Sequence, residues 1–101
     1  MDKDALISHV RARLDHLTQK QILREKYEAR MLFAHAGGMW RAGPELQAIL
    51  LTCPESEAVL VDLYDTPVKI TVAELMELSQ QRWQEQMTAW HEEWTPLKTR
   101  R

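Results

Sequence analysis

The sequence predicts an α+β, helix-dominated fold, with two long terminal helices, a short central helix, and a small antiparallel β-hairpin or three-stranded sheet. Three observations support this fold class. Residues 4–36 contain neither Pro nor Gly and carry apolar residues at helical spacing. Residues 58–70 hold two runs rich in branched side chains, separated by a turn sequence. A heptad stripe of mostly aromatic residues then follows towards the C-terminus.

Length and composition indicate a single domain over residues 1–101. Of the 101 residues, 45% are hydrophobic and 28% are charged, which is ordinary for a globular domain. A domain of this size buries a modest share of its surface, so a partner would add to its stability.

The first predicted helix covers residues 4–36 and would be about 50 Å long. Asp2 or Asp4 can cap its start, and Gly37 and Gly38 are expected to end it. Its apolar stripe weakens around residues 19–21 and resumes on a rotated face, so a kink or two shorter helices are alternatives. The two halves of the stripe are Leu6, Ile7, Val10, Leu14, Leu17 and then Ile22, Leu23, Tyr27, Met31, Leu32.

Two short elements are predicted after the glycines. Residues 39–42 alternate in the manner of a strand, with Met39 and Arg41 on one side and Trp40 on the other. Pro44 suits the first position of a helix, which we expect to run to about residue 52 before Pro54 blocks it.

A β-hairpin and the last helix complete the prediction. The strands are residues 58–63 and 68–70, joined by residues 64–67, which have turn chemistry. Thr71 and Glu74 have capping-box spacing, so the helix should begin near Val72. Pro96 disfavours helix at the residue before it, which predicts an end at residue 94 or 95.

The stripe on this last helix is the main candidate site. Its spacings of four, three, four and three residues are typical of a helix that packs on another helix. Trp is common at binding hot spots, and it suits a core less well because its indole N–H needs an acceptor. The stripe can therefore face either the first helix or another chain. The candidate interface residues are Trp83, Met87, Trp90, Trp94 and Leu97, together with Trp40.

Motifs for catalysis or metal binding are not evident, so we expect neither an enzyme nor a cofactor or metal site. His9 and His16 are seven residues apart on one helix, too far for a single metal site without other elements. Asp62 and Asp65 flank the hairpin turn, where an acid–base pair, a cation site and simple turn formation are all alternatives. Cys53, the only cysteine, is expected to be a small buried residue at a helix end.

Charge and hydropathy favour a protein partner, either a second copy of the chain or another protein. The net charge of −2 gives no strong field for nucleic acid, and Lys98, Arg100 and Arg101 form only a small basic tail. No secretory signal and no apolar run of about 20 residues is evident, so we expect neither export by a signal peptide nor a membrane span. A small-molecule substrate is not expected.

Four segments of the sequence resemble small proteins encoded by tailed bacteriophages. The resemblance covers roughly residues 37–97 and rests on short motifs, namely Gly37-Gly38-Met39-Trp40, Gly43-Pro44-Glu45-Leu46, Asp65-Thr66-Pro67-Val68-Lys69-Ile70 and Trp90-His91-Glu92-Glu93-Trp94. It implies a virion component, an assembly factor or a modifier of host machinery, located in the host cytoplasm or the virion.

The functional prediction is a non-enzymatic protein-interaction module that binds through its long helices, as a structural or assembly component of a phage particle. The alternative is a phage-encoded regulator or inhibitor that binds a host enzyme or transcription complex. This second function would use acidic and aromatic positions such as Glu92, Glu93 and Trp94.

Overall fold

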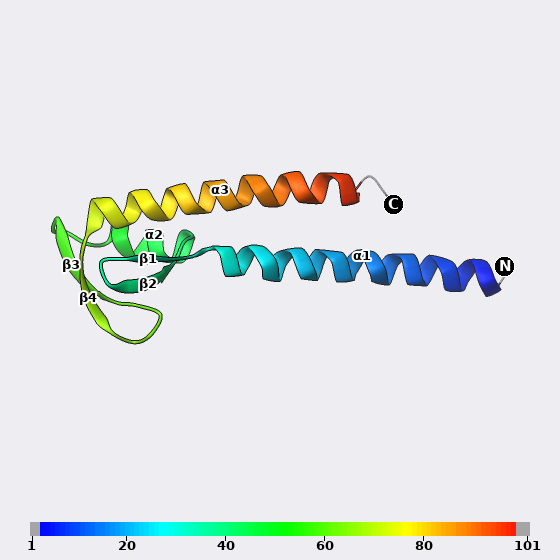
Figure 1. Ribbon diagram of the computed structural model, residues 1–101, viewed down its shortest axis with the longest axis horizontal. Coiled ribbons are helices and arrows are strands. Elements are labelled where there is room, and N and C mark those ends of the chain that lie inside the picture. The colour runs from blue at the N-terminus through cyan, green and yellow to red at the C-terminus, as the bar shows by residue number, and fades with distance from the viewer. Residues whose placement is uncertain (1–2, 99–101) are drawn as a thin grey trace.

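The computed structural model describes residues 3–98 and, for residues 3–96, their side chains. The predicted fold class is confirmed, since the chain has two long terminal helices, a short central helix and small antiparallel sheets (Figure 1). In chain order the elements are α1 (Lys3–Arg30), β1 (Leu32–His35), β2 (Gly38–Arg41), α2 (Pro44–Leu51), β3 (Glu57–Val61), β4 (Pro67–Thr71) and α3 (Val72–Lys98).

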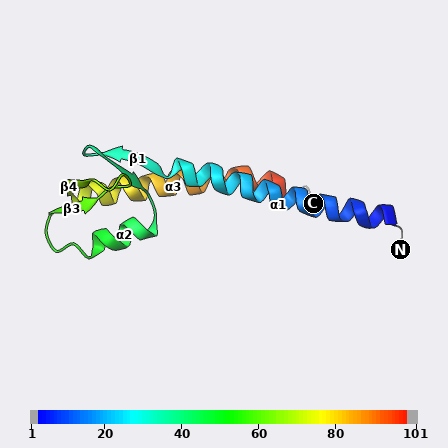
Figure 2. The ribbon, with the colours of Figure 1, turned by 90° about the horizontal axis from the view of Figure 1, so that it is seen from below.

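The chain forms a small head from which two antiparallel helices extend. The four strands and α2 lie at one end, and α1 and α3 run side by side away from them (Figures 1 and 2). The molecule measures 66 × 24 × 21 Å, and its radius of gyration is 19.5 Å. A compact chain of this length has a radius of gyration of about 13 Å. The elongation comes mainly from α1, which extends past the end of α3 (Figure 1).

The first helix ends earlier than the sequence predicts. We expected it to reach residue 36, but α1 ends at Arg30 and Leu32–His35 form β1. Gly37 does not stop a helix; it lies in the tight turn of the hairpin that joins β1 to β2. Ala36 and Gly37 have φ angles of 54° and 84°, which suit the twist of a two-residue hairpin turn. The helix continues without a break through residues 19–21.

The head contains two separate two-stranded sheets, not the single hairpin or three-stranded sheet that we predicted. β1 pairs with β2, and β3 pairs with β4, both antiparallel. Met39 connects the sheets: its carbonyl accepts a hydrogen bond from the Leu63 amide, and its amide donates to the Asp62 carboxylate. The predicted strand near residues 39–42 and the predicted hairpin after Pro54 are therefore present, and β1 is the strand that the sequence analysis missed.

The hydrophobic core lies in the head, where α2, the hairpins and the start of α3 meet. The most deeply buried apolar side chains include Leu50 of α2 and Leu75 of α3, which are 1% and 0% exposed. Pro44 occupies the start of α2, as predicted. The core cluster comprises Met31, Phe33, Trp40, Ala42, Leu46, Leu50, Ile70 and Leu75.

The last helix begins as predicted but runs further. α3 starts at Val72, whose amide donates a hydrogen bond to the Ser56 carbonyl. It continues through Pro96 to Lys98, so the predicted end at residue 94 or 95 is wrong. Pro96 removes a single helical hydrogen bond, and because it lies in the last turn of α3, the helix tolerates the loss.

Gly43 fixes the approach of α2 to α3. Its φ and ψ of 143° and −176° fall in a region that only glycine adopts readily. Its amide donates to the Ser79 hydroxyl over 3.4 Å, and a Cβ at this position would lie 3.2 Å from the Trp83 ring. The backbone conformation therefore requires glycine, and a side chain here would also press on Trp83.

Replacing Gly43 with alanine should destabilise the fold by about 1–3 kcal/mol from backbone strain, with a further cost for displacing Trp83. Urea unfolding monitored by circular dichroism measures this loss. Gly37→Asn is the matched control, because Gly37 also has a positive φ but has open space around it. Asparagine tolerates that conformation, so the control should lose less than about 1 kcal/mol. Equal losses in the two variants would contradict the role given to Trp83.

Candidate functional site

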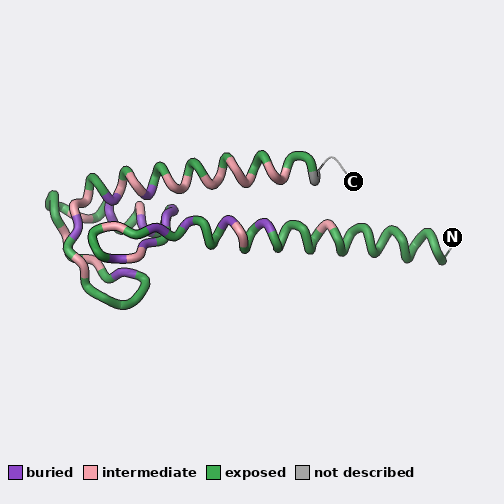
Figure 3. Tube along the Cα trace, in the orientation of Figure 1, coloured by how far each residue is buried: buried purple, intermediate pink, exposed green. Residues whose placement is uncertain are grey.

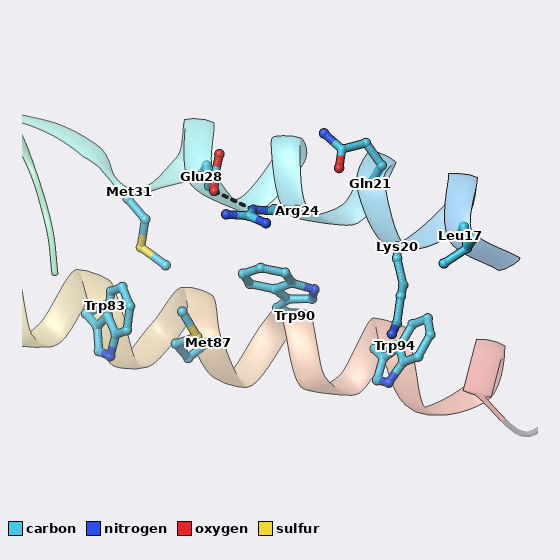
Figure 4. Close-up of a pocket in the computed structure, with 10 residues that line it drawn as sticks. All are labelled: Leu17, Lys20, Gln21, Arg24, Glu28, Met31, Trp83, Met87, Trp90 and Trp94. Carbon is cyan, nitrogen blue, oxygen red and sulfur yellow. Dashed lines mark hydrogen bonds and ion pairs between the residues drawn. The ribbon is translucent and has the colours of Figure 1, made fainter. Parts of the chain in front are cut away.

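A groove of about 700 Å³ lies between α1 and α3, and the aromatic stripe forms one of its walls (Figure 4). Three of its lining residues are tryptophans of α3, and all three are half-buried. The α1 wall is mostly polar. The lining comprises Leu17, Lys20, Gln21, Arg24 and Glu28 of α1, Met31 just after α1, and Trp83, Met87, Trp90 and Trp94 of α3.

One edge of the groove is closed by contacts between the helices. The Tyr27 ring stacks on Trp90, with ring centres 5.7 Å apart and planes 8° apart. Leu23 and Tyr27 are the only buried residues of α1, at 4% and 3% exposed. Their burial shows that this side of α1 faces α3.

An ionic cluster of Lys26, Tyr27 and Glu93 reinforces this closed edge. The Lys26 ammonium donates to both carboxylate oxygens of Glu93, over 2.8 and 2.9 Å. The Tyr27 hydroxyl donates to the same carboxylate over 2.6 Å. Charge-assisted hydrogen bonds of this kind are stronger than neutral ones, so the cluster fixes the spacing of α1 and α3.

The cluster shifts the pKa of both acidic groups in it. The hydrogen bonds from Lys26 and then Tyr27 lower the pKa of Glu93, because they stabilise its charged form. The pKa of Tyr27 is raised, first by donation to Glu93 and then by burial, since both favour the neutral hydroxyl. The carboxylate is therefore the charged partner at neutral pH.

The opposite edge of the groove is open to solvent. Arg24 and Glu28 form an ion pair of 2.9 Å there, with side chains 65% and 58% exposed. At the far end of the groove, the Trp94 ring contacts the His16 ring, with ring centres 5.0 Å apart. The Lys20 ammonium lies 5.6 Å from the centre of the Trp94 ring. These contacts occur near the C-terminal end of α3.

The N-terminal half of α1, up to Leu17, has an exposed apolar face. Five apolar side chains there are 47% to 56% exposed, and Figure 3 shows this part of the helix almost entirely as exposed. Burying each of them fully would stabilise the chain by about 1 kcal/mol or more. The residues of this apolar face are Leu6, Ile7, Val10, Leu14 and Leu17.

The predicted interface residues do not all lie at one surface of the structure. Trp83, Met87, Trp90 and Trp94 line the groove, so the stripe faces α1 on one side and open space on the other. Trp40 is 3% exposed and its indole N–H donates to the His35 carbonyl, which makes it a core residue and not a surface one. Leu97 lies outside the described side chains.

Asp62 is a structural residue of the hairpins. Its carboxylate accepts hydrogen bonds from the amides of Met39, Tyr64 and Thr66, at 2.9 to 3.0 Å. These bonds, with those of Met39 and Thr66 largest, lower its pKa although burial opposes the shift. Asp65 is exposed in the turn with a φ of 59°. Of the alternatives weighed for the two residues, the geometry supports turn formation.

The remaining candidate residues for metal or nucleophilic chemistry are dispersed. Within residues 3–98, no group of three or more His, Cys, Asp or Glu residues is placed to hold a metal ion. His35 lies 3.8 Å from Glu74, and Cys53 follows α2 with its thiol 3.5 Å from the Ile49 carbonyl. No helix in the described part of the chain is both apolar and long enough to cross a membrane.

Comparison with known proteins gives no relative, because no family model, curated protein or solved structure matches this chain. The groove therefore has to be interpreted from its own geometry.

Sequence reasoning missed the α1 wall of the groove. Gln21, Arg24 and Glu28 continue the three- and four-residue spacing of the apolar face, but they are polar and so do not register in an apolar pattern. The signal that could have revealed them is the heptad spacing itself, traced from Ile7 to Met31.

Glu93→Gln should loosen the contact between α1 and α3 without affecting the head, because it removes the charge that binds Lys26. Hydrogen exchange of the α1 amides of residues 20–30 should become several-fold faster. Glu92→Gln is the matched control, since this neighbour is exposed. The difference in amide exchange rate between wild type and Glu93→Gln should be present above pH about 4.5 and disappear as pH falls through the lowered pKa of Glu93. Equal exchange in both variants would contradict this assignment.

Asp62 should make the stability of the head sensitive to acid. Its lowered pKa means that its contribution is fully present above the unfolded value of about 4 and is lost as pH falls through the folded value. Asp62→Asn should therefore be less stable at neutral pH and should converge with wild type in acid, as thermal unfolding at a series of pH values would show. Asp65→Asn, at a positive φ that asparagine tolerates, should behave as wild type.

Proposed function

We propose that this chain is a non-enzymatic protein-interaction module that binds a helix of a protein partner with α1 and α3. The observation that carries the proposal is the exposed apolar face of α1, which continues into a groove lined by three tryptophans. A helix laid in an apolar groove is a common mode of protein recognition.

The chemistry of the groove supports a protein as the ligand. Trp side chains are frequent among residues that dominate binding energy, and indole rings offer both an apolar surface and a hydrogen-bond donor. The Arg24 and Glu28 pair at the open edge can remain partly solvated at the rim of such an interface. A contiguous apolar stripe on a helix surface is itself typical of an interaction site.

We further propose a structural or assembly role in a phage particle. The support for this setting is the resemblance of the four sequence segments to proteins of tailed phages, and one of those segments contains Trp90 and Trp94 of the groove. An accessory component that binds through helices needs no catalytic group.

The alternative function, regulation of a host enzyme or transcription complex, would have to use fewer residues than the sequence suggested. Glu93 is bound to Lys26 and Tyr27 within the chain, so its carboxylate is already occupied. Glu92 is exposed and Trp94 is half-buried at the end of the groove. These two residues are the ones left to contact a host protein.

Leu14→Asp should remove the bound partner, because it places a charge in the middle of the apolar face. In cells that contain the natural partner, tagged wild-type protein should recover it, and the variant should recover about tenfold less or lower still. Leu51→Asp is the control, since Leu51 is an exposed apolar residue of the head at 77%. Quantitative mass spectrometry of the copurified proteins measures the difference. Equal recovery of every protein, including second copies of the chain, by all three forms would refute the proposal.

A further inference from the structure

We propose that the partner of the groove is a second copy of this chain, bound antiparallel about a two-fold axis near Thr18. In this dimer the apolar face of each α1 lies in the groove of the other copy. The inference rests on the proposed function and deepens it by naming the partner.

The exposed area of the chain favours such a dimer. Its accessible surface is 7611 Å², whereas a folded monomer of 11.9 kDa exposes roughly 6,000 Å². The excess of about 1,600 Å² per chain would give an interface of about 3,200 Å² for two copies, within the range of obligate homodimers. The radius of gyration of 19.5 Å, larger than that of a compact chain of this length, points to the same conclusion.

The apolar face and the open side of the groove lie on the same side of α1. On an ideal helix of 100° per residue, the apolar face from Leu6 to Leu17 and the groove residues of α1 from Leu17 to Glu28 point within about 30° of each other. Both directions are roughly 95–130° from the side of α1 that carries the buried Leu23 and Tyr27 and faces α3. A helix lying on the apolar face of one copy therefore continues directly along its groove.

The two surfaces also match in length, which makes them self-complementary. Ile7 to Leu17 and Gln21 to Met31 each span ten residues, or about 15 Å of helix. Rotation by 180° about an axis near Thr18 and Gln19 exchanges these two segments, so one operation fills both grooves. In each half of the dimer three helices then meet, namely α1 and α3 of one copy and the N-terminal half of the other α1.

Charges at the edges of the stripe fit this orientation. Arg11 and Glu25 are fourteen residues apart and so lie on the same flank of α1, outside the apolar face. In the antiparallel dimer Arg11 of one copy comes opposite Glu25 of the other. On the other flank Lys20 comes near the axis, where each copy holds its ammonium 5.6 Å from its own Trp94 ring centre. Arg24 and Glu28, which the incoming helix would cover in part, already neutralise each other.

Sedimentation equilibrium tests the oligomeric state. The wild-type chain should have twice the mass of 11.9 kDa. The double variant Val10→Asp with Leu14→Asp should raise the dimer dissociation constant by about 100-fold or more. The control Leu51→Asp should remain a dimer, and circular dichroism should show that the head of each variant is folded. A wild-type monomer at every concentration, or a dimer that survives the double variant, would overturn the inference.

Disulfide trapping tests the orientation, in chains that also carry Cys53→Ser. Ile7→Cys mixed with Met87→Cys should give a mixed disulfide, since the two-fold axis brings residue 7 of one copy to the groove of the other. Ile7→Cys alone should not cross-link to itself. A self-cross-link at position 7 would indicate parallel helices, and absence of the mixed disulfide would show that the groove is not filled in this way. Either result would overturn the proposal.

The two proposals fail in distinguishable ways. If the wild-type chain is a monomer, but another protein copurifies with it and not with Leu14→Asp, the dimer is refuted and the interaction module is supported. If the wild-type chain is a monomer and Leu14→Asp recovers the same proteins as wild type, both proposals are refuted.

Discussion

The contact of Leu23 and Tyr27 with α3 is the interaction on which the rest of this architecture depends. Stacking of Tyr27 on Trp90 and the bonds of Lys26 and Tyr27 to Glu93 hold the helices along one edge. Because the contact is on one edge, the tryptophans are covered on that side and reachable on the other. The same contact sets the direction in which α1 leaves the head, and α3 ends before it can cover the first turns of α1 (Figure 1).

Most elements of the fold were predictable, and the exceptions have physical causes. Pro44 and the branched residues of β3 and β4 act locally, so those elements were predicted correctly, and the Thr71–Glu74 spacing predicted the start of α3 at Val72. β1 was missed because Leu32 and Phe33 extend the apolar rhythm of the preceding helix, and their pairing with Trp40 and Arg41 is a tertiary preference. The end of α3 was misplaced because the helix tolerates Pro96 in its last turn.

Only one wall of the candidate site, the one formed by α3, was predictable from the sequence. The tryptophan spacing identified the α3 wall, since aromatic residues at heptad positions stand out in any sequence. The opposite wall consists of polar residues whose role follows from position alone. The sequence also could not show that Trp40 is a core residue and not an interface residue, because its burial arises only when the hairpins and helices of the head pack together. Its indole N–H finds an acceptor in the His35 carbonyl, the condition under which tryptophan is accommodated in a core.

The exposed first half of α1 has a consequence for helix formation itself. A helix segment of about four turns with few tertiary contacts is marginal in water, because so few turns do not recover the free-energy cost of nucleating the first one. Here nucleation is supplied by the second half of the same helix, anchored at Leu23 and Tyr27, and the helix grows from it towards residue 3. The fraying boundary of α1 then moves with whatever occupies its surface, so the length of this helix reports its binding state.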